Sequence, residues 1–153
     1  MKSPQMIKPA TTRDFDLVFS LMQEYFEYDA IPWNSRIRRG LKLLLENRAL
    51  GQVFLIHVGQ EIAGYTVVTR GFDLEFGGVF GLITDLYIRA QFRRLGLGTK
   101  TIEYLLKVCK VQNMRSIELQ VQKHNKKACR FYQKLGFVSY ERVLLSKSTE
   151  IKK

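Results

Sequence analysis

The chain of 153 residues has few of the residues that staple or interrupt a fold: two cysteines, three prolines and one tryptophan. Cys109 and Cys129 both fall in expected helices, so we interpret them as reduced packing residues and expect neither a disulfide framework nor a metal site. No apolar run approaches the roughly 18 residues of a membrane-spanning helix. The N-terminal stretch lacks the apolar segment of a signal peptide. We therefore expect a cytoplasmic protein without a metal or a membrane partner.

Acidic residues are scarce in one part of the chain. Lys and Arg number 25 against 14 Asp and Glu, a formal net charge of +11. Residues 89–134 carry a net charge of +10, whereas residues 1–88 carry −1. Such asymmetry favours a polyanionic partner, either nucleic acid or a phosphorylated cofactor. A solvated basic surface without a partner remains the alternative, because summed charge reports on solubility as much as on a site.

Apolar residues are abundant enough to build a core. Hydrophobic residues make up 46% of the chain and aromatic residues 12%, which excludes a disordered protein. At roughly 100–200 residues per domain, the length predicts one domain. We place this domain at residues 1–145 and expect residues 146–153 to form a polar, basic tail.

Hydrophobic periodicity predicts the order of the elements. Strands are expected at Gln5–Pro9, Gln52–Val58, Ile62–Thr69, Val79–Ile88, 117–121 and Phe137–Leu145. Helices are expected at Arg13–Tyr28, Ser35–Asn47, Gly98–Val111 and Asn125–Leu135. Three successive strands favour an antiparallel meander, and the later helices require parallel crossovers. The predicted fold class is α/β (α+β), with a mixed, mostly antiparallel sheet of six to seven strands flanked by about four helices.

The junction IRAQFRRLGLGTK at residues 88–100 follows an expected strand and opens an expected helix. Gly96 and Gly98 have no side chain to block an approaching phosphate. The first amides of a helix lack internal acceptors and bind anions, and Arg93 and Arg94 add cationic donors. The P-loop pattern and the dinucleotide fingerprint are both absent. We interpret the junction as a pyrophosphate-binding loop of another kind.

Two blocks of this sequence resemble the GNAT N-acetyltransferase superfamily. RRLGLG is similar to its acyl-CoA pyrophosphate loop, R/Q-x-x-G-x-G/A, with Arg93, Gly96 and Gly98 in the defined positions. HNKKACRFYQKLGF is similar to the family signature N-x-x-A-x-x-F-Y-x-K-x-G-F. Ala90 stands where the family usually has proline, which removes no hydrogen-bond donor. The resemblance covers roughly residues 79–140 and is only architectural before them.

The resemblance implies an acyl-CoA N-acyltransferase-like fold whose two central parallel strands splay apart at the cofactor site. Acetyl-CoA would bind as co-substrate between Thr84–Ile88 and Ser116–Val121. Strand backbone would hold the pantetheine arm, loop amides the pyrophosphate, and Asn125 the pantetheine or the adenosine. The cofactor-binding residues implied are Leu86, Tyr87, Ile88, Arg93, Arg94, Leu95, Gly96, Leu97, Gly98, Thr99, Asn125 and Tyr132.

The resemblance also implies direct transfer of an acetyl group to a primary amine. A base must first remove a proton from the ammonium, because only the free amine has a lone pair. Asp85 and Glu75 are the candidate bases, and either of them could instead hold the amine while water carries the proton. Tyr132 matches the family tyrosine near the CoA sulfur and is the candidate general acid, although it also suits a core stripe.

In this family the first helices and the hairpin at residues 71–78 shape the acceptor pocket. Tyr28, Asp73 and Glu75 are the candidate substrate-binding residues, since carboxylates beside aromatics suit a cationic amine. We therefore expect a small cationic or polyamine-like acceptor, and we allow for a homodimer.

Other functions remain open at this stage. An acetyltransferase acting on a protein or peptide lysine or N-terminus is one alternative, and an acyl-CoA sensor without catalysis is another. A basic nucleic-acid-binding module is a third. We expect no nucleic-acid partner, because the lysines of the helix at 99–111 do not form one groove-entering face.

Overall fold

The computed structural model describes residues 5–150 and confirms the predicted order of elements through α4. The strands are β1 (Gln5–Pro9), β2 (Gly51–Val58), β3 (Glu61–Asp73), β4 (Gly78–Ile88) and β5 (Ile117–Leu119). The α-helices are α1 (Phe15–Tyr28), α2 (Arg36–Glu46), α3 (Leu97–Val111) and α4 (Lys126–Lys134), with 3₁₀ turns at Thr12–Asp14 and Ala90–Phe92. No helix among the described residues is long and apolar enough to cross a membrane.

Within residues 5–150 the strands form a single mixed sheet in the order β1-β2-β3-β4-β5. Every neighbouring pair is antiparallel except β4 and β5, which run parallel. This topology confirms the predicted fold class, with five strands where the sequence suggested six or seven. The chain divides into two compact units, Met1–Gln120 and Val121–Lys153, and the sheet lies in the first.

The strand expected at Phe137–Leu145 is wrong, because residues 137–150 have no regular secondary structure. Val138, Val143 and Leu144 are 74%, 79% and 71% exposed. Alternation of apolar and polar residues is a local property, whereas a strand also needs a neighbour to pair its backbone groups. Within its described residues the second unit has no strand that could serve as that neighbour.

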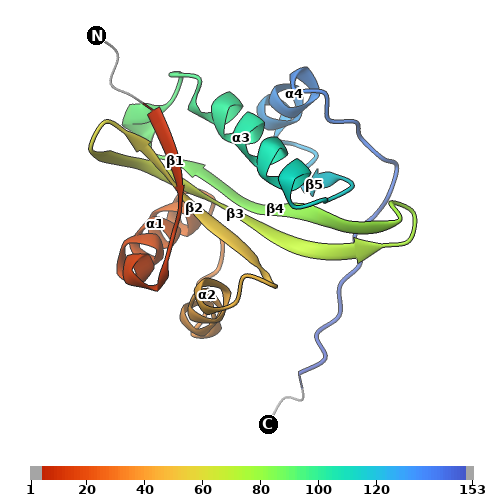
Figure 1. Ribbon diagram of the computed structural model, residues 1–153, viewed down its shortest axis with the longest axis horizontal. Coiled ribbons are helices and arrows are strands. Elements are labelled where there is room, and N and C mark those ends of the chain that lie inside the picture. The colour runs from red at the N-terminus through yellow and green to blue at the C-terminus, as the bar shows by residue number, and fades with distance from the viewer. Residues whose placement is uncertain (1–4, 151–153) are drawn as a thin grey trace. The chain divides into compact units, whose positions relative to one another are not determined.

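Helices cover both faces of the sheet in the first unit. Figure 1 shows α1 and α2 on one face and α3 on the other. β2 is buried on both faces: Val53 and Leu55 pack with α1 and α2, whereas Ile56 packs with Leu97 at the start of α3. Because successive strand residues point to opposite faces, a strand that is covered on both faces has consecutive apolar residues in its sequence.

Among the described residues, the edge of β4 that pairs with β5 has no neighbouring strand beyond Ile83. The parallel ladder with β5 covers only three residue pairs and ends at Ile83 opposite Leu119. On its other side β4 stays paired with β3 as far as Ile88, with a register shift that leaves Thr84 as an extra residue. Bulges bend a strand and increase its twist, and this one lies immediately beyond the last pair that β4 forms with β5.

Gly64 on β3 allows the close approach of β4, and its replacement tests this packing. A Cβ at Gly64 would lie 2.0 Å from the backbone oxygen of Tyr87, and backbone cannot swing aside. We expect Gly64→Ala to lower the free energy of unfolding by about 2–4 kcal/mol, measured by urea denaturation. Gly40→Ala in α2 is the control, since nothing lies within 4 Å of its Cβ. It should raise stability by about 0.5–1 kcal/mol, and equal effects at both sites would contradict this account.

Candidate functional site

The glycine loop ends in an exposed N-terminus of α3. Gly96 is the N-cap in a left-handed conformation (φ 75°), and nothing lies within 4 Å of a Cβ placed there. Its carbonyl accepts the amide of Lys100, but no side chain caps the helix. The amides of Leu97 to Thr99 are thus the unpaired donors of a first helical turn. Together with the helix dipole they form an anion-binding position.

The strand β1 braces this loop from the side. Gln5 donates through Nε2 to the carbonyl of Leu95 at 3.4 Å and accepts a hydrogen bond from Lys100 Nζ. Arg94 has a positive φ of 62° and an exposed side chain, so two left-handed residues, Arg94 and Gly96, flank Leu95. Left-handed backbone in such loops turns amides towards one side, as in known anion-binding nests.

Arg93 turns towards the strand that precedes the loop. Its Nε donates to the carbonyl of Ile88 at 2.8 Å, and its guanidinium carbon lies 4.3 Å above the ring of Tyr28. Cation–π contact and a hydrogen bond together fix this side chain. The sequence predicts Arg93 as a phosphate donor, whereas the structure commits its Nε to the end of β4.

The open edge of β4 presents backbone groups outward. Arg89 donates its amide to Ala63 on β3, and alternate residues of an antiparallel strand face the same neighbour. Tyr87 therefore faces β3 with its backbone, while Leu86 and Ile88 turn theirs away from it. Beyond Ile83 no strand among the described residues pairs with that edge. An extended ligand can add there as a strand does.

Asp85 lies where β4 and β5 part, and it has a buried partner. The hydroxyl of Tyr65 donates to its Oδ2 at 2.7 Å, and the hydroxyl of Thr66 donates to its backbone carbonyl at 2.8 Å. Burial raises the pKa of the Asp85 carboxyl, and the hydrogen bonds from Tyr65 and Thr84 oppose that rise. Burial and the Asp85 charge likewise raise the pKa of Tyr65. A carboxyl so placed takes up a proton more readily than an exposed aspartate does.

An ion pair ties α1 to the end of β4 on the same face. Arg89 donates to both carboxylate oxygens of Glu24, from Nε at 2.9 Å and from Nη2 at 2.6 Å. The pair lowers the pKa of Glu24, chiefly through the hydrogen bond from Arg89. The hydroxyl of Tyr87 also reaches Glu24 at 3.4 Å. Because Arg89 is neutralised in this way, it is less available to an anionic ligand.

Asp73 and Glu75 lie at the other end of β4. Asp73 is the last residue of β3 and Glu75 lies in the turn that follows, where Asp73 Oδ1 accepts the amide of Glu75 at 2.8 Å. Asp85 pairs with Val67, and Asp73 lies six residues further along β3, which is about 20 Å in a strand. The structure thus brings Asp85 close to Tyr65 but does not bring it close to the turn.

The second unit carries the two remaining candidates on α4. Asn125 caps this helix by accepting the amide of Ala128 at 3.1 Å through Oδ1. The ring of Tyr132 packs between those of Phe131 and Phe137, at centroid distances of 5.0 and 5.5 Å. Burial raises the pKa of Tyr132, so its hydroxyl stays protonated at neutral pH.

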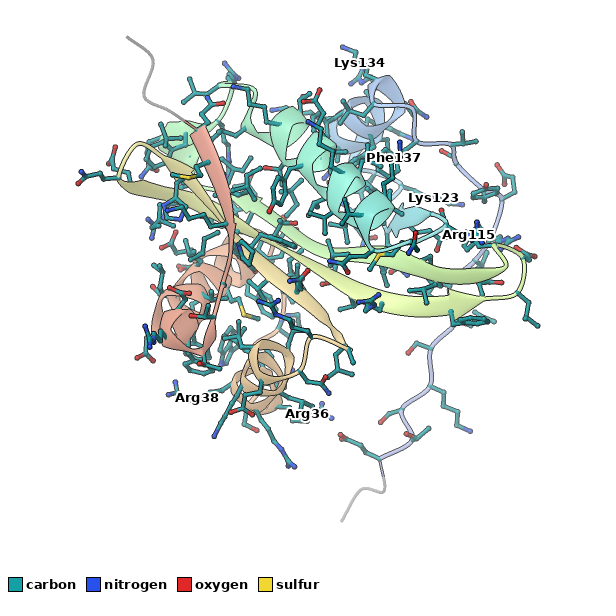
Figure 2. The ribbon with its side chains drawn as sticks, in the orientation of Figure 1. Arg36, Arg38, Arg115, Lys123, Lys134 and Phe137 are labelled. Atoms are coloured by element: carbon teal, nitrogen blue, oxygen red, sulfur yellow. The ribbon has the colours of Figure 1, made fainter. Side chains whose placement is uncertain are left out.

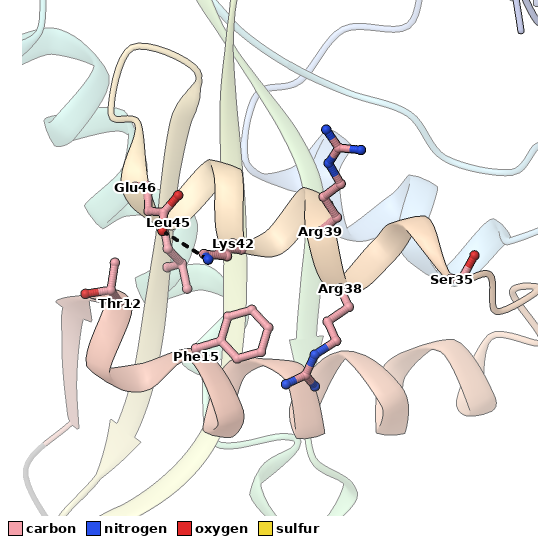
Figure 3. A pocket seen from close by; sticks show the side chains of 8 residues that line it. All are labelled: Thr12, Phe15, Ser35, Arg38, Arg39, Lys42, Leu45 and Glu46. Atoms are coloured by element: carbon pink, nitrogen blue, oxygen red, sulfur yellow. Dashed lines mark ion pairs between the residues drawn. The ribbon is translucent and has the colours of Figure 1, made fainter.

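A cavity of about 570 Å³ lies between the start of α1 and α2, away from the loop and from Asp85. It is lined by Thr12, Phe15, Ser35, Arg38, Arg39, Lys42, Leu45 and Glu46. Arg38 reaches over the ring of Phe15, whereas Lys42 approaches Glu46 (Figure 3). Figure 2 shows Arg36 and Arg38 on α2, on the sheet face opposite α3. None of the predicted site residues lines this cavity, and its cationic rim does not suit a cationic amine.

A glycine-capped helix N-terminus suits an anionic group, and an open strand edge suits an extended ligand with hydrogen-bonding amides. The profile of the acetyltransferase (GNAT) family matches residues 15–137. The chain belongs to the GNAT acetyltransferase family.

Three similar proteins illustrate this membership. A thialysine N-epsilon-acetyltransferase of Caenorhabditis elegans is 27% identical over 124 residues, covering 80% of this chain and 76% of that protein. N-alpha-acetyltransferase 50 of Danio rerio is 47% identical over 56 residues, covering 36% of this chain and 33% of that protein. A predicted acetyltransferase from Clostridium acetobutylicum, solved with acetyl-CoA, has a TM-score of 0.78 and 20% identity, covering 94% of this chain and 96% of that one.

Sequence reasoning missed the partners of the predicted residues. Tyr65 and Arg89 were not singled out, although both contact or flank the end of β4. A signal for Tyr65 was present, because the expected hairpin places β3 opposite β4. The two register shifts of β3 against β2 and β4 obscure which residues face each other.

Proposed function

We propose that the protein transfers an acetyl group from acetyl-CoA to a primary amine. Two features together carry the proposal. One is the start of α3, capped by Gly96, and the other is the edge of β4 at Leu86 and Ile88 that faces away from β3. Membership of the GNAT acetyltransferase family supports it.

The residues present fit acetyl-CoA. The amides from Arg94 to Thr99 suit its pyrophosphate, and the outer groups of Leu86 and Ile88 suit the amides of its pantetheine arm. The net charge of +10 over residues 89–134 suits its phosphates. When bound, acetyl-CoA supplies the acetyl group as a thioester.

Two side chains handle the protons in this proposal. Asp85 accepts a proton from the ammonium form of the acceptor, directly or through water, and its raised pKa brings its basicity closer to that task. Glu75 is the competing base. Tyr132 holds a proton on its phenol oxygen for the departing thiolate, and its raised pKa keeps that oxygen protonated until then.

The acceptor that suits this face best is cationic. Tyr28 is 62% exposed, and the Arg93 guanidinium lies over its ring, a contact that supports a cation-binding role for this ring. Asp85 supplies negative charge on the same face of the sheet. Thialysine, named for a relative of this chain, carries a primary amine.

Turnover of acetyl-CoA with a panel of acceptors tests the proposal. The panel contains thialysine, spermidine, an aminoglycoside, a peptide with a free N-terminus and a peptide with an internal lysine. Release of CoA is measured with a thiol reagent, and the acetylated product is identified by mass spectrometry. One of the three small cationic amines, thialysine, spermidine or the aminoglycoside, is expected to be the preferred acceptor. Preference for the free peptide N-terminus would favour the N-alpha-acetyltransferase alternative, which the relative from Danio rerio supports. No turnover with any acceptor would contradict the proposal.

Substitution of Asp73 and Glu75 should affect extended acceptors but not short ones. Because the turn lies about 20 Å from Asp85 along the strands, only a long polycation can reach both. We expect Asp73→Asn with Glu75→Gln to raise KM about fivefold to tenfold for an extended basic peptide of about eight residues, which spans roughly 25 Å, and to leave KM for thialysine unchanged. Initial rates at saturating acetyl-CoA measure this. Unchanged KM for both acceptors would exclude the turn from acceptor binding.

A further inference from the structure

Tyr65 is a buried polar group to which the proposed reaction assigns no task. Its side chain is 0% exposed in the core between the sheet and α1, where a phenylalanine would fill almost the same volume. A buried hydroxyl needs a hydrogen-bond partner. The partner of Tyr65 is Asp85 Oδ2, at 2.7 Å.

The backbone of Asp85 is fixed independently of its side chain. The hydroxyl of Thr66 donates to the Asp85 carbonyl at 2.8 Å, and the extra residue Thr84 forms the bulge immediately before it. Tyr65 and Thr66 are neighbours on β3, so one short segment holds both the backbone and the carboxylate of Asp85. The side chain of Asp85 is therefore held just beyond the last residue pair of β4 and β5.

The Asp85 carboxylate accepts hydrogen bonds from hydroxyls, and aromatic rings surround Tyr65, which donates one of them. From α1, the ring of Tyr25 lies 6.3 Å from that of Tyr65; from β4, the ring of Tyr87 lies 6.4 Å away. Glu24 and Arg89 flank Tyr87 but pair with each other. Among residues 5–150 no Lys or Arg forms an ion pair with Asp85. Its ionised form therefore depends on hydroxyl donors, of which Tyr65 is the buried one.

We propose that Tyr65 is a positioning residue, which keeps the Asp85 carboxylate ionised and in one orientation towards the acceptor amine. This inference rests on the role of Asp85 in the proposed function. A hydrogen bond from a neutral donor to a carboxylate favours its charged form. Loss of the Tyr65 hydroxyl therefore raises the pKa of Asp85, and activity at low pH falls because more of the base is protonated.

The experiment compares Tyr65→Phe with the wild type in the pH dependence of kcat/KM for the best acceptor. We expect the acidic limb to move to higher pH by about one to two units, with activity recovering at alkaline pH. Tyr104→Phe on α3 is the matched control, since it deletes the same atom on the other face of the sheet, where its ring packs on Phe54. Its acidic limb should coincide with that of the wild type. Thermal melting confirms that both variants fold.

A second readout does not require turnover. The titration of the Asp85 carboxyl is followed by ¹³C NMR in the wild type and in Tyr65→Phe, with the resonance assigned by Asp85→Asn. An upward shift in Tyr65→Phe supports the proposal. An unshifted titration, with rates lowered equally at every pH, overturns the role of Tyr65 alone. Full activity of Asp85→Asn overturns the role of Asp85, and with it this inference.

Discussion

Gly96→Glu is expected to weaken acetyl-CoA binding about a hundredfold or more, measured by calorimetry. Two unit charges of like sign about 4 Å apart near a protein surface repel by about 4 kcal/mol, and each 1.4 kcal/mol is a factor of ten in affinity. The new carboxylate would stand at the cap of α3, where the pyrophosphate is proposed to bind. A positive φ of 75° adds strain of about 1–2 kcal/mol for any side chain there.

Two further variants separate charge from strain. Gly96→Ala adds the strain without the charge and should weaken binding only severalfold. Gly77→Glu adds the same charge at the β3–β4 turn, where φ is 67° and nothing lies within 4 Å of a Cβ. It should bind acetyl-CoA as the wild type does. Equal losses in Gly96→Glu and Gly77→Glu would show a general effect of charge, and micromolar binding by Gly96→Glu would exclude this loop as the pyrophosphate site.

Asp85→Asn is expected to lower kcat/KM for the acceptor by about a hundredfold to ten-thousandfold, the usual contribution of a general base. The asparagine keeps the volume and can still accept the Tyr65 hydroxyl bond, but it cannot take up a proton. Affinity for acetyl-CoA should stay unchanged. Glu75→Gln tests the alternative base. A large loss of kcat/KM in Glu75→Gln, with near-normal rates in Asp85→Asn, would identify Glu75 as the base.

The pH dependence of stability distinguishes a lost base from a damaged fold. Burial raises the pKa of Asp85 above its unfolded value, so the native state binds more protons than the unfolded state between the two pKa values. Stability contributed by this carboxyl therefore falls as pH rises through that window. Asp85→Asn lacks this loss, so its free energy of unfolding at pH 8 should equal or exceed that of the wild type. A clearly less stable variant would point to a structural cause for its low activity.

Much of the loop could be predicted because its signals are local. A strand, two glycines and a helix in succession at residues 88–100 specify a helix start without side chains, and the structure places the cap at Gly96. The helices and the first five strands followed from periodicity in the same way. The segment 137–145 shows where this reasoning stops: its alternation is strand-like, but no described strand of its unit pairs with it.

The sequence by itself determined the family, the order of elements through α4 and the glycine loop, because these depend on residue types at fixed short spacings. Only the tertiary structure decided that Tyr65 meets Asp85, that Arg93 turns to Ile88 and Tyr28, and that the Asp73 turn lies far from Asp85. The first and third of these depend on how β3 and β4 align, and the second depends on where the end of α1 lies beside the loop. Since one extra residue in a strand changes every pairing beyond it, the bulges in the sheet set the alignment of β3 and β4 and local patterns do not.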